Sequence, residues 1–202
     1  MKLTTTTTIM AVAAGFVIAR SGVKENTSVQ QYAHTQTSIA EPHGRRMEKN
    51  PFENLSKKEL WQYYREYRKD GNTLKDSGLY DASVVLLLGA AECAGKLDRR
   101  DLASWQMNNA AKHLIDKFKE RTGYGHRMNT IESMKRGEEK QRYIDKTRDV
   151  LLGYIENLET AHEYLQEAAV LNEQLPDERR NRVISSNSKF ISWVKSFVYP
   201  ES

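Results

Sequence analysis

The chain has 202 residues, of which 31 are Lys or Arg and 27 are Asp or Glu, giving a formal net charge of +4. Because the two signs are interleaved along most of the sequence, the composition favours solvated helix surfaces over a dedicated nucleic-acid-binding stripe. The single cysteine, Cys93, excludes an internal disulfide, and its apolar neighbours predict a buried side chain.

Residues 1–19 have the pattern of a secretory signal peptide. Lys2 precedes an apolar run of eleven residues, Ile9–Ala19, and Val17 and Ala19 fit the −3 and −1 positions of a cleavage site. The run is shorter than the roughly 20 apolar residues that a membrane-spanning helix needs. We therefore expect a signal peptide or a short anchor, and an exported protein that is periplasmic, secreted or held at a membrane by its N-terminus.

Residues 20–54 are polar and lack apolar periodicity. Such a segment buries too little apolar surface to offset the entropy lost on ordering. The sequence therefore predicts a flexible linker here, followed by a folded domain over residues 55–199.

Helical spacing of apolar residues runs through this domain. Ser56 and Glu59 form a predicted capping box for a first helix that ends at Gly78. Residues 80–94 are apolar nearly all round, which predicts a buried second helix closed by Gly95. A third helix is expected over residues 101–121.

The second half of the domain begins with a polar loop, residues 122–138, that can hold a short helix. Apolar residues then recur with a heptad period over residues 144–175, with Leu151, Leu158 and Leu165 seven residues apart. This heptad seam predicts one long helix, bent or broken at Gly153 or folded back near Asn157. A last helix is expected over residues 177–198. The predicted fold is all-α, with five to six helices in antiparallel hairpins, as a stack or an irregular bundle.

The region Tyr67–Ala90 resembles a tetratricopeptide repeat (TPR). The family's pattern of large and small residues is matched at Tyr67, Gly71, Leu74, Gly78, Tyr80, Ser83, Leu87 and Ala90. Weaker matches start at Trp105 and cover residues 161–178, so the repeat would be degenerate. The resemblance implies helical hairpins whose first helices line a groove that binds an extended peptide or the C-terminus of a partner.

Seven residues would face such a groove in this register: Arg65, Arg68, Asn72, Lys75, Asn108, Asn109 and Lys112. Cations and amide donors of this kind satisfy a terminal carboxylate with charge-assisted hydrogen bonds. The function expected from the sequence is an exported adaptor or scaffold for a protein or peptide partner.

Two alternatives stay open at this point. The heptad seam 144–175 could pair between chains in a self-associating structural protein, for example a homodimer. The pI of about 9.0 could instead indicate a binder of anionic surfaces or nucleic acid, although export argues against nucleic acid.

The sequence offers no enzyme motif and no set of cofactor ligands. Phosphate-binding loops, dinucleotide fingerprints and nucleophile elbows are absent from the sequence. Glu159 and His162 form one E-x-x-H, whereas a di-iron bundle requires two. We therefore expect no catalytic residues, no cofactor and no metal site.

Overall fold

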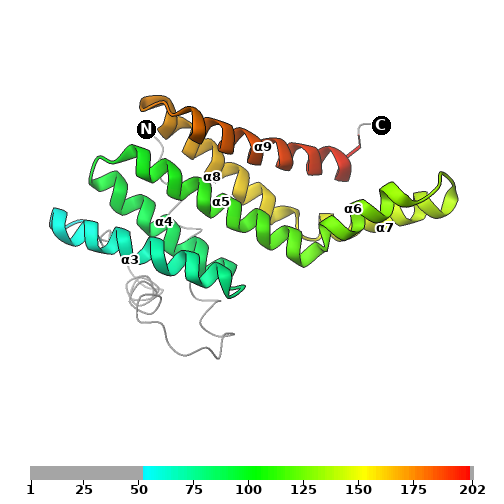
Figure 1. The fold of residues 1–202 in the computed structure, drawn as a ribbon, viewed down its shortest axis with the longest axis horizontal. Coiled ribbons are helices and arrows are strands. Elements are labelled where there is room, and N and C mark those ends of the chain that lie inside the picture. Colours follow the sequence, from blue (N-terminus) through cyan, green and yellow to red (C-terminus); the bar gives the residue numbers. More distant parts are fainter. Residues whose placement is uncertain (1–51, 201–202) are drawn as a thin grey trace, which may run out of the picture. The chain divides into compact units, whose positions relative to one another are not determined.

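The computed structural model describes residues 52–200, which form seven α-helices and no strands (Figure 1). The helices are α3 (Lys57–Asp76), α4 (Tyr80–Lys96), α5 (Arg100–Thr122), α6 (Tyr124–Ser133), α7 (Glu138–Leu152), α8 (Ile155–Gln174) and α9 (Glu178–Val198). The prediction of an all-α fold is confirmed. The predicted signal segment, 1–19, and nearly all of the predicted linker, 20–54, lie outside the described residues.

The chain divides into two compact units, the first ending at Gln106 and the second beginning at Met107. Helix α5 is continuous across this boundary and contributes its first turns to unit 1 and the rest to unit 2. In the described part of the chain, no helix is both long enough and apolar enough to cross a membrane.

Unit 1 starts earlier than the sequence predicted. Phe52 is buried, and its ring packs edge-on against Tyr63 and Tyr67, at centroid distances of 6.4 and 6.2 Å. Phe52 is therefore part of the packed unit, although the sequence placed residues 52–54 in the predicted linker. Helix α3 then begins at the predicted capping box, where the Glu59 backbone N–H donates to Ser56 Oγ and the Ser56 backbone N–H donates to Glu59 Oε2.

Helices α3 and α4 pack tightly at Gly71. A Cβ atom built on Gly71 would lie 3.1 Å from Leu87 Cγ and 3.2 Å from the Ser83 carbonyl oxygen. Ser83 Oγ donates a buried hydrogen bond of 2.6 Å to the Gly71 carbonyl. The small residues in the predicted pattern thus let the two backbones approach, and Gly78 makes the turn between the helices with a left-handed φ of 74°.

The connection from α4 to α5 differs from the prediction that Gly95 ends the helix. Helix α4 continues through Gly95 to Lys96, and the left-handed residue is Asp98, with φ 56°. Aspartate tolerates this conformation better than most residues because its short polar side chain can bond locally. Gly95 was therefore wrongly predicted as the end of the helix.

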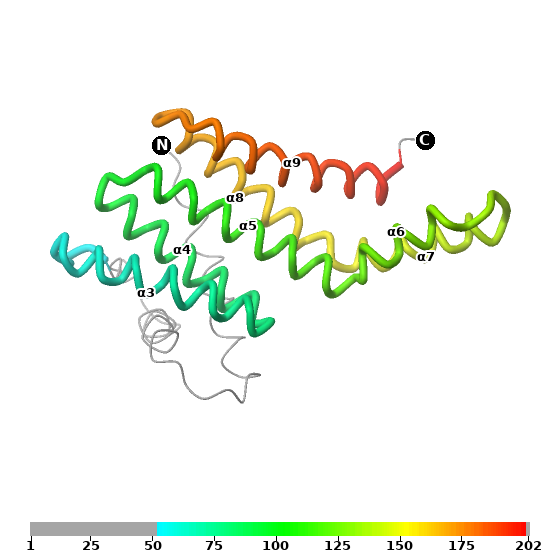
Figure 2. Tube along the Cα trace, in the orientation of Figure 1, coloured from blue at the N-terminus to red at the C-terminus, as the bar shows by residue number. Residues whose placement is uncertain are grey.

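Unit 2 contains a short helix within the segment predicted as a polar loop. Residues 122–138 were expected to be able to hold such a helix, and α6 occupies ten of them, preceded by Gly123 in a left-handed conformation. Helices α6 and α7 run side by side as a hairpin (Figure 2). No residue of α6 is buried, so this helix adds no side chain to the core of unit 2.

The heptad seam spans two helices, α7 and α8, which are separated at Gly153 and Tyr154. Leu151, Leu158 and Leu165 are at most 1% exposed. Helix α8 packs against α9 within unit 2 (Figure 2). The central seam positions are thus already buried by the chain itself, while Leu175, at its end, is 49% exposed.

A bulkier residue at Gly71 should weaken unit 1. We expect Gly71→Val to lower the free energy of unfolding by about 1–3 kcal/mol, because the added atoms meet Leu87 and the backbone of α4. Gly95→Ala is the matched control, since a Cβ atom added at Gly95 would have nothing within 4 Å. It should stabilise α4 by up to about 1 kcal/mol. Thermal unfolding followed by circular dichroism measures both changes, and a Gly71→Val variant as stable as the parent would contradict the close contact.

Candidate partner-binding site

One side of α3 carries a row of basic and amide side chains. Trp61, Arg65, Arg68, Asn72 and Lys75 follow one another at spacings of four, three, four and three residues, so they share one face of the helix. We call these five residues the basic face of α3. It flanks the buried face that packs on α4, and Asp76, four residues after Asn72, borders its C-terminal end.

The opposite flank of α3 has the reverse charge. Glu59, Glu66 and Asp70 lie there, and Glu66 accepts a hydrogen bond of 3.0 Å from Gln62. Most acidic and basic side chains of α3 are thus separated, with Asp76 at the C-terminal end of the basic side and Lys69 three residues from Glu66 as the exceptions. This sorting differs from the interleaving seen along most of the chain, and it gives α3 a local field that attracts anions to one side.

The two arginines of the basic face are open to solvent. Arg65 and Arg68 are exposed, and neither forms an ion pair with a residue of the described region. Asn72 is exposed, and Lys75 is half-buried. The four α3 residues predicted from the sequence therefore lie together on an accessible surface.

Trp61 was not predicted as part of this site, although its spacing from Arg65 could have indicated it. Its ring is half-buried and packs edge-on against Tyr64 at 5.6 Å. The guanidinium of Arg65 lies 6.0 Å from the Trp61 ring centroid and that of Arg99 lies 5.7 Å from it. At these distances a cation is attracted to the face of an indole.

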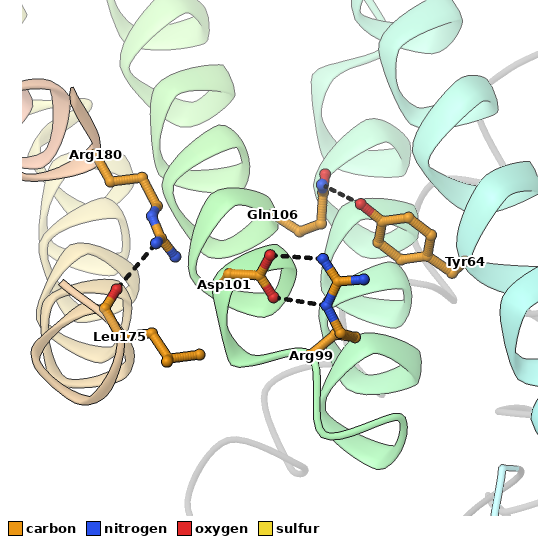
Figure 3. A network of polar contacts seen from close by, with 6 residues as sticks. All are labelled: Tyr64, Arg99, Asp101, Gln106, Leu175 and Arg180. Atoms are coloured by element: carbon orange, nitrogen blue, oxygen red, sulfur yellow. Dashed lines mark hydrogen bonds and ion pairs between the residues drawn. The ribbon is translucent and has the colours of Figure 1, made fainter. Parts of the chain in front are cut away.

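Arg99 reaches this surface from the turn before α5. Its Nε and Nη2 donate to the two carboxylate oxygens of Asp101, at 2.9 and 2.7 Å (Figure 3). This bidentate contact raises the pKa of Arg99 above its usual value. The same ion pair fixes the guanidinium beside Trp61.

The start of α5 is joined to α3 by a buried hydrogen bond. Gln106 Nε2 donates to the Tyr64 hydroxyl at 3.2 Å, and both side chains are at most 3% exposed (Figure 3). Residues from two helices and one turn therefore surround the Trp61 end of the basic face.

The three residues predicted from α5 differ in accessibility, and Lys112 alone of them is exposed. Asn108 is 1% exposed, and its Oδ1 accepts a hydrogen bond of 3.1 Å from Asn187 of α9 within unit 2. Lys112 pairs with Asp116 at 2.8 Å, and Asn109 is half-buried. The repeat register placed these residues on one face but could not show that Asn108 is enclosed by α9.

The residues considered for metal or redox chemistry are engaged elsewhere. Glu159 lies 3.8 Å from Lys195, and the His162 ring nitrogen Nε2 is 3.1 Å from Gln166 Nε2. Among residues 52–200, no group of three or more potential metal ligands is clustered. Cys93 is fully buried, and burial raises the pKa of its thiol to about 12.

Comparisons of this chain with protein-family models, with curated proteins and with solved structures found no match.

The burial of Cys93 has a simple chemical consequence. Because the thiolate is the reactive form, a pKa near 12 keeps the thiol protonated and inert at neutral and mildly alkaline pH. We expect no labelling of the native chain by iodoacetamide under these conditions and complete labelling after denaturation. Rapid labelling of the folded protein, detected by mass spectrometry, would show that Cys93 is accessible.

Proposed function

We propose that this protein is a non-catalytic, helical protein-interaction module that binds an acidic peptide segment, or the C-terminal carboxylate of a partner, through the basic face of α3. The observation that carries the proposal is the pair of exposed arginines, Arg65 and Arg68. They lie beside Trp61, on a side of the helix whose single acidic residue is Asp76 at its C-terminal end, and form no ion pair within the described region.

The chemistry of the basic face suits a carboxylate. A guanidinium presents a planar fork of N–H donors that matches the two oxygens of a carboxylate. Trp61 supplies adjacent apolar surface, and aromatic and Arg side chains are the residues most enriched at binding hot spots. The arginines can therefore bind the carboxylate of a peptide while Trp61 contacts a neighbouring side chain of the same peptide.

The scaffold beneath this face is rigid, which lowers the entropy lost on binding. Tyr64 and Tyr67 of α3 are at most 4% exposed and anchor the helix from its inner side. Contacts at Gly71 and Ser83 fix α3 against α4. The binding side chains thus project from a helix whose position is already set.

The same contacts support a TPR-like hairpin as the architectural basis of the module. The pattern residues Gly71, Ser83, Leu87 and Ala90 are all buried at or near the helix–helix contact. We propose that α3 and α4 are a degenerate repeat and that α5 begins the next one. The α5 side of the surface is then limited to its first turns, because Asn108 is enclosed.

We also propose that the module works after export, through the leader predicted at residues 1–19. N-terminal sequencing of the protein from the envelope and the medium of its host tests this step. A mature chain that begins near residue 20 is the expected result. Full-length protein confined to the cytoplasm would contradict export without affecting the binding proposal.

Charge reversal on the basic face tests the binding function. Acidic peptides with a free C-terminus, titrated by fluorescence anisotropy, should bind the parent, and Arg65→Glu with Arg68→Glu should weaken binding at least about tenfold, because two charge-assisted contacts become repulsive. Lys135→Glu with Arg136→Glu makes the same charge change in the turn between α6 and α7 and should leave affinity nearly unchanged. An equal loss of affinity in both double variants would show that binding depends on the net charge of the protein and not on the basic face of α3, which would contradict the proposal.

A further inference from the structure

The outward side of α9 carries a second basic surface, with a different composition from that of α3. Arg182, Ser186, Lys189 and Trp193 are spaced by four, three and four residues and are all exposed. We call these four residues the outer face of α9. Helix α9 begins with the exposed Glu178, four residues before Arg182, and from residue 179 to residue 200 the sequence has five Lys or Arg and no Asp or Glu.

The two cations of this face are not neutralised by the neighbouring helices of unit 2. Arg182 and Lys189 form no ion pair with a residue of the described region. Of the other three cations of the segment, Arg180 is buried and donates to the Leu175 carbonyl at 3.0 Å (Figure 3), Lys195 lies 3.8 Å from Glu159, and Arg179 is exposed in the turn before Arg182. The unneutralised charge thus lies on the outer face and in the helical turn that precedes it.

Hydroxyl and amide groups lie between the two cations. An open depression on this side of α9 is lined, among the described residues, by Asn181, Arg182, Ser185, Ser186 and Lys189. All of these side chains can donate hydrogen bonds, and none carries negative charge. A phosphate group, with its several acceptor oxygens and its negative charge, is the ligand that this donor set fits best.

Trp193 extends the outer face by one further turn and adds a different kind of contact. Its side chain remains 48% exposed although the ring stacks on Phe197, at a centroid distance of 5.6 Å and an angle of 12°. The ring edge also meets Tyr124 at 6.0 Å. The indole is therefore held in place with much of its surface open, and indole rings favour the boundary between lipid headgroups and acyl chains.

From these observations we infer that the outer face of α9 docks on an anionic phospholipid surface. Arg182 and Lys189, with the serines between them, would contact lipid phosphates, while Trp193 enters the interfacial region. Trp193 has an open indole, whereas Trp61 on the basic face of α3 is half-buried and has the guanidinium groups of Arg65 and Arg99 over its ring. Only the outer face of α9 therefore offers an indole that can enter a lipid boundary, and we assign it to lipid and the basic face of α3 to a protein partner. The inference is independent of the proposed peptide binding.

Co-sedimentation with vesicles tests this inference directly. The full chain should sediment with vesicles that mix phosphatidylglycerol and phosphatidylcholine, should remain in solution with phosphatidylcholine alone, and should be released by salt. Arg182→Gln with Lys189→Gln should reduce partitioning by roughly 30-fold, because each cation near a charged surface contributes about fivefold. Trp193 should become less accessible to a water-soluble quencher on binding, measured in a Trp61→Phe, Trp105→Phe background.

The control is the same neutralisation on α3, Arg65→Gln with Arg68→Gln, which should bind vesicles like the parent. Equal losses in the two double variants, or equal binding to neutral vesicles, would overturn the inference. Binding of inorganic phosphate at millimolar concentration, measured by calorimetry, without binding to vesicles would assign the depression to free phosphate and also overturn the inference. Binding to RNA without binding to vesicles would do the same. Peptide binding by the α9 variant reports separately on the α3 proposal.

Discussion

The close approach of α3 and α4 at Gly71 is the constraint on which the rest of unit 1 depends. Position 71 has no room for a side chain because Leu87 packs directly against the Gly71 backbone. Across the same contact, the Ser83 hydroxyl donates a hydrogen bond to the Gly71 carbonyl. Because helix–helix packing is this tight, small changes of volume are transmitted to the whole hairpin. The orientation of α3, and so the direction of its exposed side chains, follows from this one contact.

Fixing α3 in this way separates its surfaces by role. The inner side is apolar and aromatic and is anchored by Tyr64, whose hydroxyl accepts from Gln106. One flank is acidic and the other is the basic face. At the Trp61 end of that face, the Arg99 guanidinium lies over the Trp61 ring and is held by its ion pair with Asp101. Such a surface is suited to recognition of a partner. Its charge attracts an oppositely charged partner, and the fixed helix loses little conformational entropy when the partner binds. In unit 2 the outer face of α9 shows a comparable sorting, with serines and an exposed indole in place of a carboxylate-binding set.

Local rules predicted unit 1 better than unit 2. The capping box at Ser56, the turn at Gly78 and the contact at Gly71 each depend on a few adjacent residues, so sequence spacing was sufficient. In unit 2 the sequence left open whether the seam would bend or break at Gly153 or fold back near Asn157, and it allowed only a short helix within residues 122–138, where α6 forms. The α3 residues of the site were predicted for the same local reason, whereas the burial of Asn108 depends on Asn187, 79 positions away. Arg99 was missed because only the fold brings it to Trp61.

The most direct test of the α3 binding face is a nuclear magnetic resonance titration of the labelled chain with an acidic peptide that has a free C-terminus. We expect the Trp61 indole N–H and the Nε–H signals of Arg65 and Arg68 to shift together and saturate with one dissociation constant, while the signals of buried Gln106 change little. Shifts confined to unit 2, or no saturable shift at the three α3 side chains, would contradict the claim that the α3–α4 hairpin presents a partner-binding face.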